Sequence, residues 1–452
     1  MSVIGSASRF CIVPAVDQLG EVRLHCEYLH KRGIPVLVLV NAGCTTDYSD
    51  CADEVVRCED IFSASDVVAS LYPYRNKLDS FASAHDRIWP AIFGASDQLG
   101  IPFPGIQAQV NCRIKPKMRE LLQPIAPLNT EVISLTDLTP RSLKSAVERV
   151  GMPFVIKPIW GQGSDYVSIV RDESRAYEDV YHTFSLMQED ASLRSFRQGE
   201  LVWDARQQLL LEEFAPGREF SLEGFIRQEK FVPLMMQEKY RWAEHDGLRF
   251  ETGNLCPTPY LRAHEKLGLQ ATVQDVLGRL GLDNSFFHIE FKWDGRLLNI
   301  VEVNPRMGGG SVPAALNFWF ESNVREMELD LRMGEVVGDL HDRKDGFLLG
   351  VFVNALETGI VDELTGVDWA RSQPEFGFET FYSRMWQFIP PRQYSKAGRE
   401  AWMYCYDVFY WCQDDGRIDY LHDETRTRVR VKLKTEREIS EGLARIAAEN
   451  FG

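Results

Sequence analysis

The sequence contains 452 residues, of which 44% are hydrophobic and 26% charged, and it carries a formal net charge of −16. This length corresponds to about two to four domains, and no apolar run approaches the roughly 18 residues that a membrane-spanning helix requires. The acidic balance argues against a nucleic-acid partner, because binding to a phosphate backbone requires a basic face. An anionic ligand would therefore have to be held by a local cluster of lysine and arginine residues.

The first residues, MSVIGSASRFCIVPAVDQLG, lack the basic region, apolar core and cleavage site of a secretion signal. The nine cysteines include no CxxC pair, and Cys44, Cys51 and Cys58 recur every seven residues without the close pairing of a zinc site. We therefore expect reduced thiols, a cytoplasmic location and no membrane partner.

Residues 1–108 alternate between strand and helix signals. The apolar runs RFCIVPAV and IPVLVLVNAG flank EVRLHCEYLHKRG, which has helical spacing and a glycine stop. This βαβ order predicts a parallel sheet with helices on its faces. No GxGxxG motif follows either strand, so we expect a scaffold rather than a dinucleotide site. A Pro/Gly cluster predicts a boundary near residue 108.

The pattern changes after this boundary. KPKMRELLQPI predicts a basic helix, and RSLKSAVERVG predicts an amphipathic helix that ends at a glycine. MPFVIKPIWGQGSDYVSIV predicts two strands around a glycine-rich turn, and QLLLEEFAPGREFSLEGF predicts strands separated by glycine turns. The charged segment from 175 to 208 is predicted to be helical.

A further β-rich region is predicted to begin near residue 346. The tail from residue 386 contains AWMYCYDVFYWC, whose aromatic side chains we expect in the core rather than in a platform for stacking bases. The chain is predicted to end in a helix, REISEGLARIAAEN.

The segment HIEFKWDGRLLNIVEVNPR, residues 288–306, predicts a β-hairpin that turns at its Asp-Gly pair. A two-residue turn would pair Trp293 with Arg296 and would place Glu290 and Glu302 on opposite faces. A longer loop or a bulge, with Trp293 opposite Leu297, places both glutamates on one face. We favour this second register because it separates polar from apolar side chains better.

The favoured register predicts the composition of both faces. Two carboxylates about 5 Å apart repel each other by roughly 3 kcal/mol at an effective dielectric constant near 20, so a positive group should lie between them. Either the face is solvated and the glutamates never meet, or a magnesium ion is held by carboxylate and amide oxygens. The polar face would carry His288, Glu290, Lys292, Leu298, Ile300, Glu302 and Asn304, and the other Ile289, Phe291, Trp293, Leu297, Val301 and Val303.

No P-loop motif of the form GxxxxGK[ST] occurs, so phosphate would have to be bound in another way. Lys157 lies on a predicted strand and is followed by Gly161, Gly163 and Ser164 in a turn. Glycine amides can cradle phosphate oxygens while a lysine neutralises their charge. The alternative is an ordinary hairpin turn. Lys115 is a second candidate cation, with solvated surface as its alternative.

Five segments in this order resemble the ATP-grasp ligases, most closely the carboxylate–amine branch that includes the L-amino acid ligases. They are KPKMRELL, FVIKPIWGQGSDYVSIV, LLLEEFAPGREFSLEGF, HIEF and VEVNPRMGGG. The resemblance covers roughly residues 110–345 and implies a fold that combines α/β and α+β parts. These would be an N-terminal parallel βαβ domain (1–108), an ATP-grasp module of two α+β subdomains (109–345, lid about 150–212) and a β-rich C-terminal region (346–452) completing the ligase core.

The resemblance also implies roles for individual residues. A nucleotide would lie between the two subdomains, next to magnesium and under a mobile lid formed by the turn from Gly161 to Ser164. Lys115 and Lys157 would contact ATP phosphates, and Gly163 would lie in the lid. The adenine would meet Glu212, Glu213, Phe214 and Ala215, and the ribose would meet Glu219. Magnesium would be bound by Glu290, Glu302 and Asn304, and Arg306 would contact the transferred phosphoryl group or the substrate carboxylate.

The resemblance implies substrate contacts for Glu251 and His288. It implies them also for Gly309 and Gly310, because the glycines of MGGGSVP allow backbone amides to approach a developing oxyanion. One position departs from the family pattern, because Asn254 stands where the branch often has histidine. Alternatives stay open for several positions. Glu212 and Glu213 could be a charged strand end, Glu219 a surface partner of Arg218, and residues 307–313 a flexible turn. His288 could support the residues that bind the ligand without touching it. Glu223 and Arg241 are expected to be structural charges.

The implied reaction is ATP-dependent joining of a carboxylate to an amine through an acyl phosphate, with release of ADP and phosphate. The implied cofactors are ATP and Mg²⁺, with two ions and with Mn²⁺ as a substitute, and Lys157 and Arg306 would be the catalytic residues. Small-molecule carboxylate and amine substrates are the expected partners, and a homodimer stays open. A bicarbonate-activating carboxylase and a non-catalytic nucleotide-binding module remain as alternatives.

Overall fold

The structure is a computed structural model of the chain. It describes residues 9–15, 19–83, 85–101, 103, 105–161, 165–190, 192–245, 248–335, 340, 345–356, 360–381, 404–434 and 438. The predicted C-terminal helix REISEGLARIAAEN lies outside these residues except for its second position, Glu438. No helix in the described part is long and apolar enough to cross a membrane.

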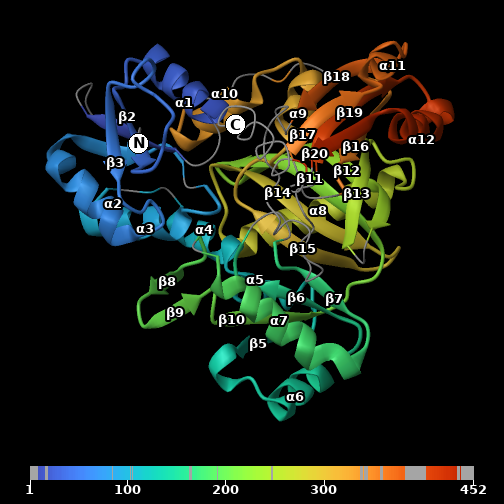
Figure 1. Cartoon of the computed structure of the whole chain (residues 1–452), viewed down its shortest axis with the longest axis horizontal. Coiled ribbons are helices and arrows are strands. Elements are labelled where there is room, and N and C mark those ends of the chain that lie inside the picture. Colours follow the sequence, from blue (N-terminus) through green and yellow to red (C-terminus); the bar gives the residue numbers. More distant parts are fainter. Residues whose placement is uncertain are drawn as a thin grey trace, which may run out of the picture.

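The N-terminal part contains a parallel four-stranded sheet, as its βαβ pattern predicted. The strand order is β3-β2-β1-β4, and every pairing is parallel. Helices accompany this sheet at the left of Figure 1, so its central strands are almost fully buried. The elements are β1 (Phe10–Ala15), α1 (Leu19–Lys31), β2 (Val36–Asn41), β3 (Glu54–Cys58), α2 (Ala64–Leu71), a 3₁₀ turn (Tyr72–Lys77), β4 (Leu78–Phe81) and α3 (Trp89–Leu99).

A second, antiparallel sheet has the order β5-β10-β6-β7 and lies at the bottom of Figure 1. Its strands β6 and β7 flank the glycine-rich turn, as predicted. The sheet comprises β5 (Thr130–Ser134), β6 (Phe154–Pro158), β7 (Ser168–Val170) and β10 (Gln208–Glu213), with helices α4 (Ile106–Arg113) and α5 (Lys115–Leu122) before it and α6 (Pro140–Val150) and α7 (Ala176–Gln188) within its span.

The prediction of helix from 175 to 208 is wrong in its second half. After α7 the chain forms a hairpin of β8 (Ser195–Gln198) and β9 (Leu201–Asp204). Gly199 has a φ of 60° at the turn between them. Positive φ at that position suits a tight hairpin, because such turns match the twist of the flanking strands, and the charged composition of the segment concealed this signal.

The largest sheet has eight strands in the order β15-β14-β11-β12-β13-β16-β19-β18. Strands from the C-terminal region therefore continue the sheet that carries the predicted metal hairpin. Residues of β19 from Cys405 to Cys412 are largely buried, as expected for its aromatic run. The strands are β11 (Arg218–Arg227), β12 (Lys230–His245), β13 (Leu248–Cys256), β14 (Ser285–Trp293), β15 (Leu298–Asn304), β16 (Phe347–Asn354), β18 (Phe376–Phe381) and β19 (Tyr404–Cys412).

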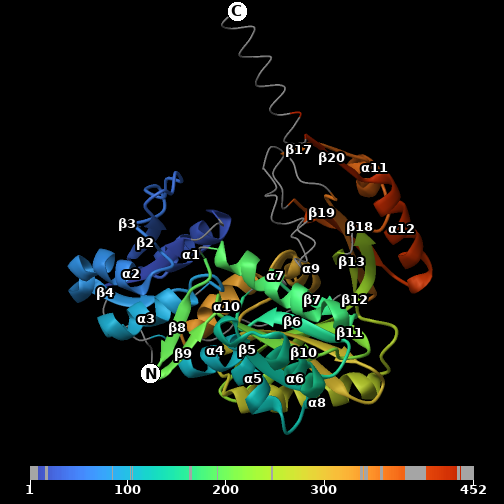
Figure 2. The same ribbon diagram turned by 60° about the horizontal axis from the view of Figure 1, so that its bottom comes forward.

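Helices pack against this sheet in separate apolar clusters. The first cluster joins α4, α5 and α8 (Ala263–Leu280) to β11, β14 and β15. The second joins α9 (Val312–Phe320) and α10 (Val324–Arg332) to β12, β14 and β16. The remaining elements are α11 (Val367–Arg371), a 3₁₀ turn (Asp415–Arg417), α12 (Ile418–Arg428) and the paired strands β17 (Ile360–Thr365) and β20 (Arg430–Lys434). Helix α12 shares an apolar cluster with β13, β16 and β19 and lies beside this part of the large sheet (Figure 2).

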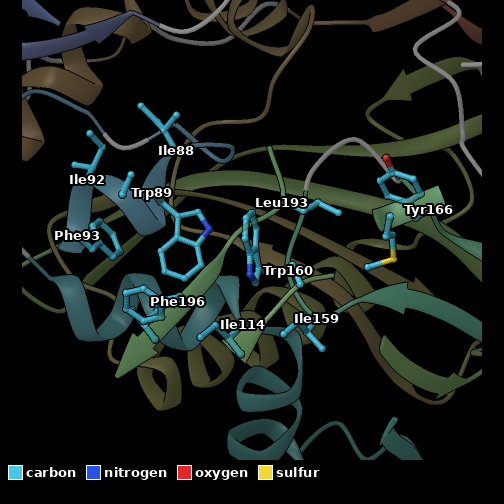
Figure 3. Packing of buried hydrophobic residues seen from close by; sticks show 14 of the residues in the cluster. Ile88, Trp89, Ile92, Phe93, Ile114, Ile159, Trp160, Tyr166, Leu193 and Phe196 are labelled. Atoms are coloured by element: carbon cyan, nitrogen blue, oxygen red, sulfur yellow. The ribbon is translucent and has the colours of Figure 1, made fainter. Parts of the chain in front are cut away.

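Aromatic packing connects the N-terminal part to the antiparallel sheet β5-β10-β6-β7 and to the hairpin of β8 and β9 (Figure 3). The Trp89 ring lies 5.6 Å from that of Trp160 and 4.6 Å from that of Phe196, measured between ring centroids. The backbone N–H of Lys115 donates to the carbonyl of Ile159 at 2.8 Å. Dense packing of this kind fixes the start of α5, and with it the side chain of Lys115.

The hairpin register confirms the central prediction and corrects its details. Trp293 pairs with Leu298 rather than Leu297, so the loop has four residues, and a bulge separates this pair from Glu290 opposite Glu302. The two glutamates are direct neighbours on one face. Leu298 and Ile300 were predicted on that face, but they lie opposite Trp293 and Phe291 on the apolar one, because the bulge reverses the alternation between the two halves of the strand.

Candidate active site

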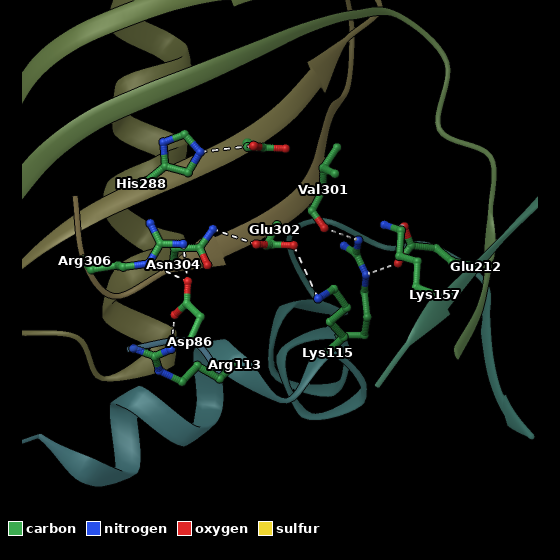
Figure 4. Close-up of polar contacts among 12 residues, drawn as sticks. Asp86, Arg113, Lys115, Lys157, Glu212, His288, Val301, Glu302, Asn304 and Arg306 are labelled. Atoms are coloured by element: carbon green, nitrogen blue, oxygen red, sulfur yellow. Dashed lines mark hydrogen bonds and ion pairs between the residues drawn. The ribbon is translucent and has the colours of Figure 1, made fainter. Parts of the chain in front are cut away.

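The two carboxylates of the hairpin lie next to lysines, and Figure 4 shows the pair formed by Glu302 and Lys115. Lys115 Nζ lies 3.3 Å from an oxygen of Glu302, and Lys239 Nζ lies 3.1 Å from an oxygen of Glu290. Asn304 donates from its amide nitrogen to the other oxygen of Glu302 at 2.7 Å. The positive charge that the carboxylate repulsion requires is therefore present, supplied from α5 and β12.

The donor set of this face fits magnesium. Among the described residues, no group of three or more His, Cys, Asp and Glu side chains is arranged to hold a metal ion. Magnesium usually takes one or two carboxylates and completes its shell with water and substrate phosphate. Glu290 and Glu302 supply two carboxylates, and turning the Asn304 amide would offer its oxygen. These residues therefore suit an ion shared with a phosphate rather than a closed protein cage.

His288 is held between two carboxylates. Its Nδ1 forms a close ion pair with Glu223, and its Nε2 lies 3.1 Å from Glu290. Burial alone would lower the pKa of His288, but Glu223 and Glu290 outweigh it and raise that pKa to about 10. The protonated ring of His288 therefore donates to Glu290 and holds its carboxylate in place. Glu223 is fully buried, and the sequence alone indicated only a structural charge at this position.

The glycines that follow β15 differ in how much space surrounds them. A Cβ atom added at Gly308 would lie 2.9 Å from Nδ1 of His288 and 3.0 Å from an oxygen of Glu223, whose other oxygen accepts the Gly308 N–H at 3.0 Å. A Cβ at Gly309 would meet nothing within 4 Å, and Gly310 has a φ of 60°. The tightest approach is therefore at Gly308, next to the two positions that the sequence singled out.

Gly308→Ala is expected to disturb this site, because the new methyl group must displace the buried His288–Glu223 pair. We expect a loss of about 1–3 kcal/mol in the free energy of unfolding, measured with urea, together with reduced activity. Gly309→Ala is the matched control for stability and should leave the free energy of unfolding nearly unchanged, because a Cβ atom there meets nothing within 4 Å. Equal behaviour of the two variants would contradict the close packing at Gly308.

Lys157 is buried in a network with Glu212. Its Nζ lies 2.6 Å from one oxygen of Glu212, and Arg119 Nε donates to the other oxygen at 2.7 Å. Burial would raise the pKa of Glu212, but Arg119 and Lys157 outweigh it and lower that pKa. The carboxylate is fully engaged, so an adenine contact at the end of β10 would use its backbone. The residues that follow are Glu213, which accepts the N–H of Asn129, and then Phe214 and Ala215.

Glu219 lies at the start of β11 between two lysines. Lys239 Nζ is 2.6 Å and Lys292 Nζ is 3.7 Å from its carboxylate oxygens. Arg218, the alternative partner of Glu219, instead pairs with Glu238. Lys239 therefore connects Glu219 with Glu290, a link that the sequence did not predict.

Arg306 forms an unforeseen cluster with Asp86 and Arg113. Its Nε lies 2.6 Å from Oδ2 of Asp86, and Arg113 closely pairs with Oδ1. Burial would lower the pKa of Arg306, but the carboxylate of Asp86 outweighs it and raises that pKa further. Asp86 comes from the loop before α3, so the N-terminal part contributes to the site. One pocket is lined by Asp86, Trp89, Cys112, Arg113, Lys115, Gly161, Glu302, Val303 and Asn304.

The remaining candidates are less closely connected to this pocket. Glu251 lies in β13 opposite Trp242, whereas Asn254 lies opposite Lys239 and donates to Gln237 at 2.8 Å. The position that departs from the family pattern is thus nearer the lysine of the site. Gly163 and Ser164 lie outside the described residues.

Comparison with known proteins identifies the central part of the chain. The family model of the ATP-grasp domain matches residues 150–314. The alanine–anticapsin ligase of Bacillus subtilis (strain 168) is 24% identical over 55% of this chain and 52% of its own length. A protein of Sinorhizobium fredii named Uncharacterized protein y4rH is 25% identical over 67% of this chain and 58% of its own length. The chain thus spans little more than half the length of these curated relatives.

A solved structure matches over nearly the whole chain. The L-amino acid ligase from Bacillus licheniformis superimposes with a TM-score of 0.72 at 18% identity, covering 95% of this chain and all of that one. At this level of identity the match concerns the fold. The resemblance predicted from the motif order is confirmed: residues 150–314 match the ATP-grasp domain, and the chain as a whole has the fold of an L-amino acid ligase.

Proposed function

We propose that this protein is an ATP-dependent ligase that joins a small carboxylate, such as an amino acid, to an amine or a second amino acid. The observation that supports this most directly is the position of Glu302, which lies opposite Glu290 in the hairpin, pairs with Lys115 and lines a pocket that also contains Arg113 and Asn304. This arrangement brings metal-type oxygen donors and phosphate-type cations to one place. Two of the matched proteins, the alanine–anticapsin ligase and the L-amino acid ligase, carry ligase names, which agrees with the proposal.

In the first step, an oxygen of the substrate carboxylate attacks the γ-phosphorus of ATP. A bond forms between that oxygen and phosphorus, the bond from phosphorus to the β–γ bridging oxygen breaks, and ADP leaves. Lys115 and Lys157 would neutralise the phosphate oxygens, while Arg306 would orient the attacking carboxylate. Such transfer depends mainly on positioning and on charge stabilisation, which these side chains supply.

In the second step, the amine nitrogen attacks the acyl carbon. The carbon–nitrogen bond forms, the carbon–oxygen bond to phosphate breaks, and the nitrogen loses a proton. Amides of the glycine segment after β15, including Gly309 and Gly310, would donate to the oxyanion that develops on the acyl carbonyl.

Glu290, Glu302 and Asn304 would hold Mg²⁺, with Mn²⁺ as a substitute. The ion would neutralise charge on the transferred phosphoryl group. His288 and Glu223 keep Glu290 oriented, and Glu219 would receive the ribose hydroxyls of the nucleotide. Small carboxylate and amine substrates are the proposed partners.

The proposal is tested by measuring ADP release from the full chain with pairs of amino acids and amines, while mass spectrometry detects the product. We expect ADP release that depends on the carboxylate substrate, and a product whose mass equals both substrates minus one water. ADP release that requires bicarbonate and no amine would indicate a carboxylase instead. Binding of ATP without ADP release for every pair would indicate a nucleotide-binding module.

A further inference from the structure

The strand β15 contains one residue without a partner in the ladder. Glu302 pairs with Glu290 and Ile300 pairs with Phe291, so Val301 between them is the extra residue of a bulge. If the pairing of Ile300 simply continued, Val301 would lie opposite Glu290, and Glu302 would turn to the other face of the sheet. The opposition of the two carboxylates therefore depends on this bulge, because bulges re-aim the side chains beside them.

Arg119 holds the backbone at this position. Its Nη2 donates to the carbonyl of Val301 at 3.2 Å, while its Nε donates to Glu212 at 2.7 Å. Lys115, one helical turn earlier on α5, pairs with Glu302. One face of α5 therefore contacts both the bulged residue and the carboxylate that the bulge re-aims (Figure 4).

The surroundings of the Arg119 guanidinium indicate that its hydrogen bond to the Val301 carbonyl helps to hold β15 in place. β15 lies at an edge of the described eight-stranded sheet, so no further strand takes the Val301 carbonyl. Arg119 is 4% exposed, and its Nη1 is buried without a partner among the described residues. The side chain is thus placed to bridge Glu212 and Val301 rather than to satisfy all its own donors. Through Arg119, Glu212 of the antiparallel sheet β5-β10-β6-β7 is connected to Val301 of the eight-stranded sheet.

We propose that Arg119 is a positioning residue for the divalent cation. It holds the Val301 carbonyl against Glu212, which keeps the bulge in place and Glu302 opposite Glu290. The inference rests on the proposed magnesium site, and it adds a residue that acts on this site through the backbone of β15. Because Lys157 also pairs with Glu212, the same bridge fixes a phosphate-binding lysine relative to the metal carboxylates.

The principal test is Arg119→Lys, which keeps a positive charge for Glu212. A lysine has a single compact head and lacks the guanidinium fork, so it does not span Glu212 and Val301 together. Mn²⁺ binding to the full chain in the presence of ADP is measured by electron paramagnetic resonance. We expect the affinity for Mn²⁺ to fall about 10-fold, the lower end of the range for groups that orient metal ligands. A thermal melt confirms that the variant is folded.

Two reference variants make the result specific. Arg149→Lys alters an exposed arginine on α6, paired with Glu131, and should bind Mn²⁺ like the wild type. Glu302→Gln removes a proposed ligand and should bind Mn²⁺ weakly. A general loss of stability in Arg119→Lys would lower the melting temperature without changing the Mn²⁺ affinity of the folded protein, so the affinity separates the two roles.

The outcomes distinguish this inference from the proposed function. Wild-type Mn²⁺ affinity in Arg119→Lys, with weak binding in Glu302→Gln, would overturn the role of Arg119 and leave the metal site standing. Wild-type affinity in Glu302→Gln would overturn both. Amide hydrogen exchange over residues 300–304 should become faster in Arg119→Lys, and unchanged exchange would contradict the bulge mechanism. If the lysine variant does not fold, Arg119→Gln takes its place in the same titration.

Discussion

Replacement of Glu302 by glutamine is expected to lower the rate of ADP formation by at least about 100- to 1,000-fold, the loss typical when one group that stabilises developing charge is removed. Glutamine keeps the size of the side chain but loses the negative charge that faces Lys115 and that would hold magnesium. The side chain of Glu302 is 25% exposed and opens to the pocket, but that of Lys115 is only 8% exposed, so we expect a modest loss of stability beside the large loss of activity. ADP release is followed with a coupled assay, and folding by a thermal melt.

Glu363→Gln provides a matched control for this substitution. Glu363 lies in β17, is 55% exposed and faces Lys432 at 3.9 Å, away from the candidate site. The control should retain both activity and melting temperature. Full activity in Glu302→Gln would show that the assignment of Glu302 to the metal is wrong.

Asp86→Ala is expected to produce the largest loss of stability, about 3–5 kcal/mol in the free energy of unfolding measured with urea. Asp86 is 5% exposed and neutralises Arg113 and Arg306, so its removal leaves the buried guanidinium of Arg113 and the partly buried one of Arg306 without this counter-charge. Asp50→Ala, which breaks the exposed pair with Arg23, should cost less than about 1 kcal/mol. A loss of similar size in both variants would contradict the role of the buried cluster.

The same cluster predicts how stability depends on pH. Burial would raise the pKa of Asp86, but Arg306 and Arg113 outweigh it and hold that pKa well below its usual value. A carboxylate with a depressed folded pKa stabilises the protein above its unfolded pKa, about 3.9, and this contribution is lost as the pH falls below about 4. Asp86→Asn should lack this component, so urea titrations below pH 4 should show a shallower loss for the variant than for the wild type.

The sequence could predict those parts of the site that local patterns encode. The alternation in residues 288–306 was enough to place Glu290 and Glu302 on one face, and the strand before the glycine-rich turn was enough to single out Lys157. The exact loop and the position of the bulge were not predicted, because alternation specifies which residues share a face but not where an extra residue is accommodated.

The partners of these residues could not be found in the same way. Asp86 is separated from Arg306 by 220 positions, and Arg119 from Glu212 by 93. No local period relates residues that meet only after two sheets pack together. Lys239 and Glu223 face the same difficulty, since an isolated charged residue in a strand resembles a solvated one until its neighbours are known.

The eight-stranded sheet includes strands of the C-terminal region, and this limits where the chain can be cut into a shorter fragment. Gly253 to Cys256 of β13 hydrogen-bond directly to β16, which in turn pairs with β19. A fragment that stopped at residue 345 would therefore expose the edge of β13, with unpaired N–H and C=O groups that invite pairing with other chains. The family model ends at residue 314, but the sheet continues beyond that limit, so a fragment made for expression should include strands β16, β18 and β19.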